Sequence, residues 1–134
     1  MPDPAPSESE LADQLKAVGC AVGRSKSGRL LRVDNRECPN QLQPDLLRQV
    51  LACTALKELY LRGSTEFLNH SVDSILALTK LKVLDVEGSD FSDDSLEQLA
   101  ACNSLQVLNV RSTAVTQACV VRMRKVLIDV RIIF

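Results

Sequence analysis

A short apolar pattern, LxxLxL, recurs at nearly constant spacing in the middle of this chain. Its three copies are LKELYL, LKVLDV and LQVLNV, which begin at Leu56, Leu81 and Leu105, with offsets of 25 and 24 residues. A unit with so few apolar residues cannot fold alone and must bury them against its neighbours. The spacing therefore predicts a row of stacked strand-and-return units that form one continuous core.

Weaker copies of the pattern flank these three segments. Upstream, Leu31 and Val33 in GRLLRVD match the second half of the pattern, and downstream Leu127, Val130 and Ile132 in LIDVRII match all of it. The sequence therefore predicts five short parallel strands in total.

The residues after each strand also repeat. A tight turn containing hydroxyl residues comes first, then one apolar residue and a residue that favours the start of a helix. Apolar residues at helical spacing follow. The turn pairs are Gly63-Ser64, Gly88-Ser89 and Ser112-Thr113, the apolar residues are Phe67, Phe91 and Val115, and the helix starts are Asn69, Ser92 and Thr116. Each unit thus specifies a strand, a turn and a return helix.

The N-terminal segment differs from the repeats. Residues 7–10, SESE, form a capping-box pattern that opens a helix ended by Gly19. CAV at 20–22 and LLRV at 30–33 flank the turn-like SKSG and predict a hairpin. We expect a disordered tail over residues 1–7 and a single domain over 8–134, in which 8–28 form an N-terminal helix-hairpin cap and 28–134 the repeats. The first unit is long and carries Pro39 and Pro44, which leaves its helix boundaries uncertain.

Composition limits the kinds of partner. The 134 residues include 16 basic and 17 acidic side chains, so no global field attracts nucleic acid or an anionic membrane. No apolar run approaches the ~20 residues of a membrane span, and the opening MPDPAPSESE lacks the features of a signal peptide. We expect a soluble, cytoplasmic protein that binds neither nucleic acid nor membrane.

The five cysteines contain no CxxC pair, which argues against a metal site. Cys53 and Cys102 each lie three residues before a leucine that begins a repeat, as small buried core residues recurring in register would. We therefore interpret the cysteines as buried free thiols and expect no metal and no cofactor.

The segments LKELYLRGSTEF, LKVLDVEGSDFSDDSLEQLAACNSL and LQVLNVRSTAVT resemble leucine-rich repeats of the cysteine-containing, ribonuclease-inhibitor-like class. The Gly-Ser and Ser-Thr turns resemble those of bacterial members of planctomycete type. This resemblance covers about residues 9–134 and implies an α/β leucine-rich-repeat solenoid with helices on the convex side. It also implies a binding scaffold, without naming a ligand. In one departure, Ser64, Ser89 and Thr113 replace the usual asparagine of the ladder position.

The residues between the inward leucines define an exposed sheet face, because side chains alternate along a strand. We assign a central column of Arg32, Tyr60, Asp85, Asn109 and Arg131, a second of Asp34, Arg62, Glu87, Arg111 and Ile133, and a third of Leu30, Glu58, Val83, Val107 and Asp129. The alternating charges either form cross-strand pairs that keep the sheet soluble or make a recognition surface. On the second interpretation the partner-binding residues are Tyr60, Arg62, Asp85, Glu87, Asn109 and Arg111.

The size of this face limits what it can bind alone. Strands ~4.8 Å apart, with about five residues each, give an area on the order of 300 Å². A standard interface needs ~800 Å² per partner. We therefore expect a protein partner to contact the adjoining turns as well, at Gly63–His70 and Gly88–Asp94.

The sequence offers little for catalysis. His70, the single histidine, has no cysteine or serine at a recognisable spacing, and Asp93-Asp94 fit the charge preference of a helix N-terminus. Arg122, Arg124 and Lys125 indicate a solvated helix face. We therefore expect no enzyme and no catalytic residues.

One alternative is a regulatory phospho-switch domain. VLDVEGSDFSDDSLEQL loosely resembles the phosphorylatable-serine segment of anti-sigma-factor antagonists, with Ser92 or Ser95 as the switch residue. Such a domain has this segment once, whereas here its pattern recurs at a fixed period, which favours the repeat interpretation.

The last expected strand, Asp129–Phe134, leaves Ile133 and Phe134 beside an open edge. Open edges pair readily with other strands. We expect weak self-association or a partner strand at this edge.

Overall fold

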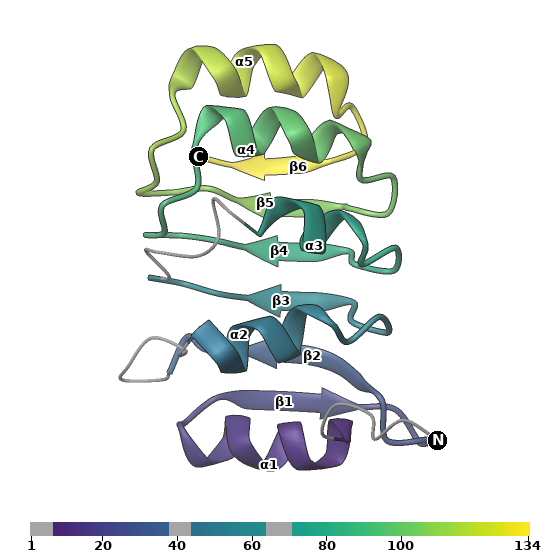
Figure 1. Cartoon of the computed structure of the whole chain (residues 1–134). Helices are drawn as coiled ribbons and strands as arrows, with labels where there is room; N and C mark the ends of the chain where they lie inside the picture. Colours follow the sequence, from purple (N-terminus) through teal and green to yellow (C-terminus); the bar gives the residue numbers. More distant parts are fainter. Residues whose placement is uncertain (1–6, 38–43, 64–70) are drawn as a thin grey trace.

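The computed structural model describes residues 7–37, 44–63 and 71–134. Over these residues the chain is mixed α/β, with one sheet of six strands and five α-helices (Figure 1). The strands are β1 (Ala21–Arg24), β2 (Leu30–Asp34), β3 (Glu58–Tyr60), β4 (Val83–Asp85), β5 (Val107–Asn109) and β6 (Arg131–Ile133). The helices are α1 (Glu8–Ala17), α2 (Pro44–Leu51), α3 (Val72–Leu76), α4 (Asp93–Gln98) and α5 (Gln117–Val126), with a 3-10 turn η2 (Leu99–Ala101) after α4.

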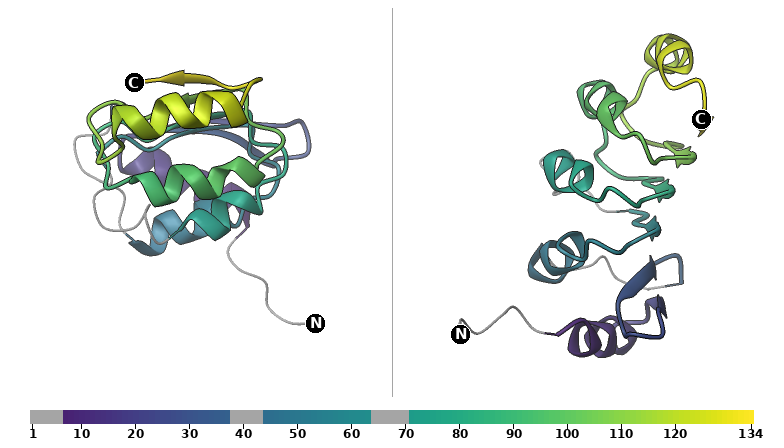
Figure 2. Two further views of the ribbon diagram at one scale, coloured as in Figure 1. Left: turned by 90° about the horizontal axis from the view of Figure 1, so that it is seen from above. Right: turned by 90° about the vertical axis from the view of Figure 1, so that its right-hand side faces the viewer.

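The strands lie across the sheet in chain order, from β1 at one edge to β6 at the other. β2 to β6 are parallel to one another, and β1 pairs antiparallel with β2. The expected number of about five strands is corrected to six, because the first strand of the hairpin joins the same sheet. Helices α2 to α5 cover one side of the sheet and leave the other side without helices, while α1 lies beside β1 at the end of the row (Figure 2).

The N-terminal segment forms the predicted helix and hairpin. The hydroxyl of Ser7 accepts a hydrogen bond from the backbone N–H of Glu10 at 3.1 Å, which caps α1 as the capping-box pattern predicts. Leu11 and Leu15 are buried against the core. The expected disordered tail lies outside the described residues, apart from Ser7.

The three strong copies of the pattern stack in register. Leu59 pairs with Leu84 and Leu84 with Leu108 across parallel strands, and all three side chains are 0% exposed. Val33 and Ile132 continue this inward column on β2 and β6. The core therefore runs unbroken through the described units, as the repeat spacing predicts.

The register of the two weak copies was predicted wrongly by two residues. On β2, Arg32 lies opposite Glu58 and Asp34 opposite Tyr60, so Arg32 is not in the Tyr60 column. On β6, Arg131 lies opposite Val107 and Ile133 opposite Asn109. Leu30, which was expected on the exposed face, is buried, and Leu31 is half-buried.

A slip of two residues is invisible to an apolar pattern, because side chains on a strand alternate with a period of two. Val33 faces inward in either register. The two registers differ at Asn35, which directly follows β2 and takes the place that Leu61 and Val86 take after β3 and β4. Because an asparagine stands where the third apolar residue of LxxLxL is expected, the segment that begins at Leu30 does not match the full pattern.

The return helices begin at polar residues, as expected. Ser92 precedes α4, and the Thr116 hydroxyl accepts the backbone N–H of Cys119 at 3.3 Å at the start of α5. Ser71 precedes α3, whereas the expected start, Asn69, lies outside the described residues. Pro44, whose place in the first unit was uncertain, is the first residue of α2, where a proline fits well because the missing N–H is not needed.

The tight turns after the strands use left-handed backbone. Gly63 and Gly88 have φ values of 76° and 72°, which glycine adopts without steric cost. Ser112, at the equivalent place after β5, has a φ of 56°. The turn geometry is therefore kept even where the glycine is absent.

The cysteines at 20, 53, 102 and 119 are buried free thiols, and Cys38 lies outside the described residues. Burial, together with the negative charge of Glu8, raises the pKa of Cys53 to about 11. Within the described residues no group of three or more histidine, cysteine or carboxylate side chains could hold a metal ion. The described helices include none with the length and apolar character needed to cross a membrane.

Replacing Leu84 with alanine tests the central column. The change should lower the free energy of unfolding by ~2–5 kcal/mol, because it leaves a cavity between two neighbours that are themselves fully buried. Urea unfolding at neutral pH measures the loss. Lys82→Ala, at an exposed position on the same unit, is the control and should change stability by about 0.5 kcal/mol or less. A cost below ~1 kcal/mol for Leu84→Ala would contradict the stacking described above.

Candidate functional site

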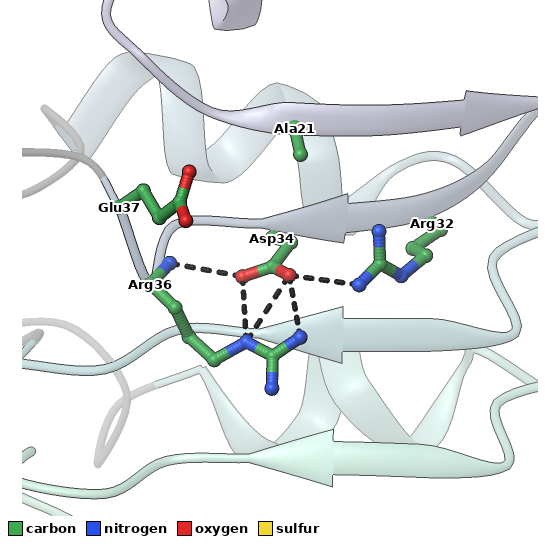
Figure 3. A pocket seen from close by; sticks show the side chains of 5 residues that line it. All are labelled: Ala21, Arg32, Asp34, Arg36 and Glu37. Atoms are coloured by element: carbon green, nitrogen blue, oxygen red, sulfur yellow. Dashed lines mark hydrogen bonds and ion pairs between the residues drawn. The ribbon is translucent and has the colours of Figure 1, made fainter.

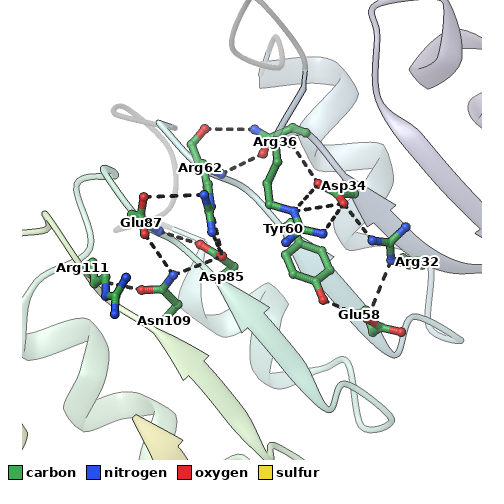
Figure 4. A network of polar contacts seen from close by, with 11 residues as sticks. Arg32, Asp34, Arg36, Glu58, Tyr60, Arg62, Asp85, Glu87, Asn109 and Arg111 are labelled. Atoms are coloured by element: carbon green, nitrogen blue, oxygen red, sulfur yellow. Dashed lines mark hydrogen bonds and ion pairs between the residues drawn. The ribbon is translucent and has the colours of Figure 1, made fainter. Parts of the chain in front are cut away.

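The side of the sheet without helices carries a network of charged and polar side chains, which we call the polar sheet face (Figure 4). Its members come from β2 to β5 and from the turns that follow them. They are Arg32, Asp34, Arg36, Glu58, Tyr60, Arg62, Asp85, Glu87, Asn109 and Arg111.

Three strands, β2, β4 and β5, share the same hydrogen bond at their carboxyl ends. A side-chain oxygen accepts a hydrogen bond from the backbone N–H two residues further along, at 2.9–3.0 Å. This Asx arrangement turns the chain out of the strand. The pairs are Asp34 with Arg36, Asp85 with Glu87, and Asn109 with Arg111.

Strand β3 ends differently, because Tyr60 stands where the other strands have an Asp or Asn. Here Asn35, from the preceding unit, accepts the N–H of Arg62 at 2.8 Å and donates to the Arg62 carbonyl at 3.0 Å. Asn35 thereby supplies the acceptor that Tyr60 lacks. Because Asn35 of the neighbouring unit makes the hydrogen bonds at the end of β3, this strand needs no Asp or Asn there, and a tyrosine can stand at the centre of the face.

Asp34 organises the N-terminal half of the face. It accepts from Arg36 Nε at 3.0 Å, from Arg36 Nη2 at 2.7 Å and from Arg32 Nη2 at 2.8 Å. Burial alone would raise the pKa of Asp34, but the hydrogen bonds from Arg36 and the charges of Arg36 and Arg32 outweigh it and lower the pKa below its ordinary 3.8. Asp34 is therefore a buried carboxylate that holds two arginines in place.

Tyr60 lies against these same arginines. The guanidinium carbon of Arg36 is 4.0 Å from the ring centroid and that of Arg32 is 5.3 Å away, both within cation–π range. The Tyr60 hydroxyl donates to Glu58 Oε1 at 2.9 Å. Burial raises the pKa of Tyr60, and the hydrogen bond to Glu58 raises it further, so the phenol stays protonated near neutral pH.

Asp85 organises the C-terminal half of the face in a similar way. It accepts from Arg62 Nη2 at 3.0 Å and from Asn109 Nδ2 at 3.2 Å. Asn109 also donates to Glu87 Oε1 at 3.1 Å, and Arg62 Nη1 lies 3.7 Å from Glu87 Oε2. Within the described residues Arg111 makes no ion pair, and its side chain is exposed.

The six expected partner-binding residues therefore fall into two groups. Tyr60, Arg62 and Glu87 are half-buried and Arg111 is exposed. Asp85 and Asn109, by contrast, are only 4% and 6% exposed. All six residues belong to the polar network. Asp85 and Asn109, however, lie below its exposed surface and hold the other side chains in place by hydrogen bonds.

Sequence reasoning missed Arg36 and Asn35. The missed signal is the Asx residue at the end of each strand: aligning Asp34 with Asp85 and Asn109 places Arg36 in the column of Arg62 and Glu87. The leucine pattern alone could not find it, because Asn35 stands in the third apolar position.

Other residues that the sequence drew attention to have structural roles or lie elsewhere. His70 lies outside the described residues. Asp93 accepts from the backbone N–H of Thr116 at 2.7 Å and from its hydroxyl at 2.8 Å, and these bonds lower the pKa of Asp93. Ser95, one of the two expected switch serines, is 1% exposed, and Ser92 is half-buried at the start of α4.

The β6 edge is partly covered from within the chain. Arg124, on α5, donates from Nη2 to the carbonyl of Ile132 at 3.1 Å. Phe134 is exposed beside it. Association through this edge stays a prediction.

Comparison with known proteins gave a limited result. No family model matches the chain, and no curated protein matches it. A solved structure that it is similar to is a leucine-rich-repeat protein of Leptospira interrogans, with 20% sequence identity and a TM-score of 0.48 over 70% of this chain. The chain spans only about a fifth of that protein, 22% of its length.

The buried carboxylate of Asp34 makes a pH-dependent contribution to stability. Because the folded-state pKa is below the ordinary 3.8, this contribution is complete above pH 3.8 and is lost as the pH falls through the folded-state value. Asp34→Asn keeps an oxygen for the Asx turn, as at Asn109, but removes the charge. The variant should therefore be less stable than wild type at neutral pH and should lose less stability below pH 3.8.

Urea unfolding at a series of pH values measures this difference. Asp13→Asn, which changes an exposed carboxylate on α1, is the control and should follow the wild-type profile. Parallel profiles for wild type and Asp34→Asn would show that Asp34 does not carry the expected charge pairing.

Proposed function

We propose that this chain is a non-catalytic leucine-rich-repeat solenoid, a single domain over residues 8–134 capped by residues 8–28, that binds another protein. The binding surface is the polar sheet face together with the turns beside it. Support for this proposal comes from the way in which the face is built and from the side chains that it presents.

The observation that carries the proposal is the arrangement of Tyr60, Arg32, Arg36 and Asp34, which we call the Tyr60 cluster. A tyrosine ring and two arginine side chains are fixed on the face by a buried carboxylate, with the ring 4.0 Å from Arg36. Tyrosine and arginine dominate binding hot spots, and side chains that are already ordered lose less entropy when a partner docks. Asp34 also ends strand β2 by accepting the backbone N–H of Arg36, so the same buried carboxylate that completes the strand orders the two arginines on the face.

The two halves of the face offer different chemistry to a partner. In the N-terminal half the arginines are paired with carboxylates. In the C-terminal half Arg111 is exposed and makes no ion pair within the described residues. Arg131, on the adjoining strand β6, is also exposed and makes no ion pair there, and it lies opposite the half-buried Val107. This half suits a partner that brings apolar side chains together with acidic ones.

The six residues expected from the sequence have distinct roles in this proposal. Tyr60, Arg62, Glu87 and Arg111 contact the partner. Asp85 and Asn109 are positioning residues, because each is buried and bonded to the side chains around it. Arg32 and Arg36 join the contact set.

The decisive experiment uses affinity capture from the source cell. The double variant Tyr60→Ala, Arg111→Glu should retain the captured protein at least about tenfold less than wild type, because it removes the hot-spot ring and reverses a charge. Quantitative mass spectrometry of the captured proteins measures retention. Partners that wild type and variant retain equally would remove the sheet face from the proposal.

The control variant is Lys125→Glu, which reverses an exposed charge on α5, on the helical side of the molecule. It should retain the partner at the wild-type level. Loss of binding in Lys125→Glu alone would move the binding site to the helices. Thermal unfolding of each variant ensures that only folded proteins are compared.

A further inference from the structure

A pocket opens at the N-terminal end of the polar sheet face, where β1 meets β2 (Figure 3). Its volume is about 300 Å³, and its walls are Ala21, Arg32, Asp34, Arg36 and Glu37. The Leu residues of the core take no part in it. The pocket lies beside the Tyr60 cluster, because Arg32 and Arg36 belong to both.

The pocket exists because β1 carries small residues on this side. Ala21 lies directly across from Asp34, and Gly23 lies across from Arg32. On the next strands the column that begins at Ala21 and Asp34 continues with larger side chains, Tyr60, Asp85 and Asn109. Because the side chain of Ala21 is only a methyl group, the space beside Asp34 at this end of the column stays open.

The hydrogen bonds within the pocket leave N–H groups of both arginines unused. Both oxygens of Asp34 are already occupied, by the backbone and side chain of Arg36 and by Arg32. A guanidinium has five N–H groups, whereas the hydrogen bonds to Asp34 use only Nη2 of Arg32 and Nε and Nη2 of Arg36. On the two arginines the unused groups are all donors, so a ligand that contacts them must bring acceptors.

Shape favours a carboxylate among acceptors. Asp34 pairs with both arginines, and Arg32 Nε also lies 3.7 Å from Glu58 Oε1, so the choice of a carboxylate rests on the geometry of the free N–H groups and not on an excess of positive charge. A planar carboxylate matches the N–H fork of a guanidinium. Glu37, the other acid of the pocket, is exposed, so water and salt screen its repulsion.

The two arginines are ordered before any ligand arrives. Asp34 holds both from below at 2.7–2.8 Å, and the Tyr60 ring lies against both. A ligand therefore does not have to fix two long side chains, which would otherwise cost free energy of binding.

We propose that this pocket binds an aspartate or glutamate side chain of the protein that docks on the polar sheet face. The inference rests on the proposed function and adds to it the chemistry of one contact: the partner's carboxylate accepts hydrogen bonds from Arg32 and Arg36 above Ala21. The partner is thus one that presents an acidic side chain next to the segment that covers Tyr60.

The test is an NMR titration with short peptides that need no knowledge of the partner. The probe is acetyl-Ser-Gly-Glu-Gly-Ser-amide, and its twin has Gln in place of Glu. The Glu peptide should shift the Nε–H signals of Arg32 and Arg36 and the amide signal of Ala21 in a saturable way. The Gln peptide should bind at least tenfold more weakly, and equal shifts with both peptides would overturn the proposal.

Two variants remove the pocket by different means. Arg36→Gln removes half of the donors, and Ala21→Leu fills the space but leaves both arginines in place. Both should abolish the shifts caused by the Glu peptide, whereas the control Lys125→Gln, which removes an exposed charge on α5, should keep them. Undiminished binding by Ala21→Leu would overturn the proposal even if Arg36→Gln disturbed the fold.

Two further arms separate the outcomes. A Gln peptide with a free C-terminal carboxylate tests for a chain end, and binding by it as tight as that of the Glu peptide would overturn the assignment to an acidic side chain. In the affinity capture, Ala21→Leu should weaken retention of the partner. Retention that is lost in Tyr60→Ala, Arg111→Glu but complete in Ala21→Leu would overturn the pocket inference and leave protein binding by the face intact.

Discussion

Each unit of this chain buries its apolar residues only in contact with its neighbours, and the rest of the structure follows from that contact. The parallel register that stacks Leu59 on Leu84 and Leu84 on Leu108 fixes which residues point into the core. By the alternation of a strand it also fixes which residues point away from the helices. The polar sheet face is therefore the reverse side of the leucine column, and any change of register would move both together.

The polar sheet face combines burial with charge in an unusual way for an exposed sheet. Asp34 and Asp85 are buried, yet Asp34 is bonded to two arginines, Asp85 to one, and each also accepts a backbone N–H. Burying a charge costs free energy unless its hydrogen bonds are satisfied. Here they are satisfied by groups that also lie at the surface, so the same bonds that stabilise the strand ends orient the arginines. This coupling links the fold of the repeat to the side chains that a partner would meet.

Much of the candidate site could be predicted from the sequence, because it lies on the three strong repeats. Tyr60, Asp85 and Asn109 were aligned correctly from the leucine pattern alone. Arg32 and Arg131 were misplaced, since their strands carry weak copies in which a shift of two residues leaves the inward apolar residues unchanged. Arg36 was missed for the same reason, and with it the half of the Tyr60 cluster that borders the pocket.

The sequence by itself determined the mixed α/β architecture, the unit length, the helix and hairpin at the N-terminus and the inward column of leucines. These features follow from local periodicity, capping residues and turns, which a chain carries in its order of residues. The tertiary structure alone decided the register of β2 and β6, the burial of Asp85 and Asn109 and the pocket above Ala21. Each of these depends on what the neighbouring strand places opposite a residue: Asn35 completes the end of β3, and Ala21 leaves space beside Asp34. Pairing across strands joins residues about 25 apart in the chain, and where the repeat is weak, as on β2 and β6, the apolar pattern does not specify which partner each residue will meet.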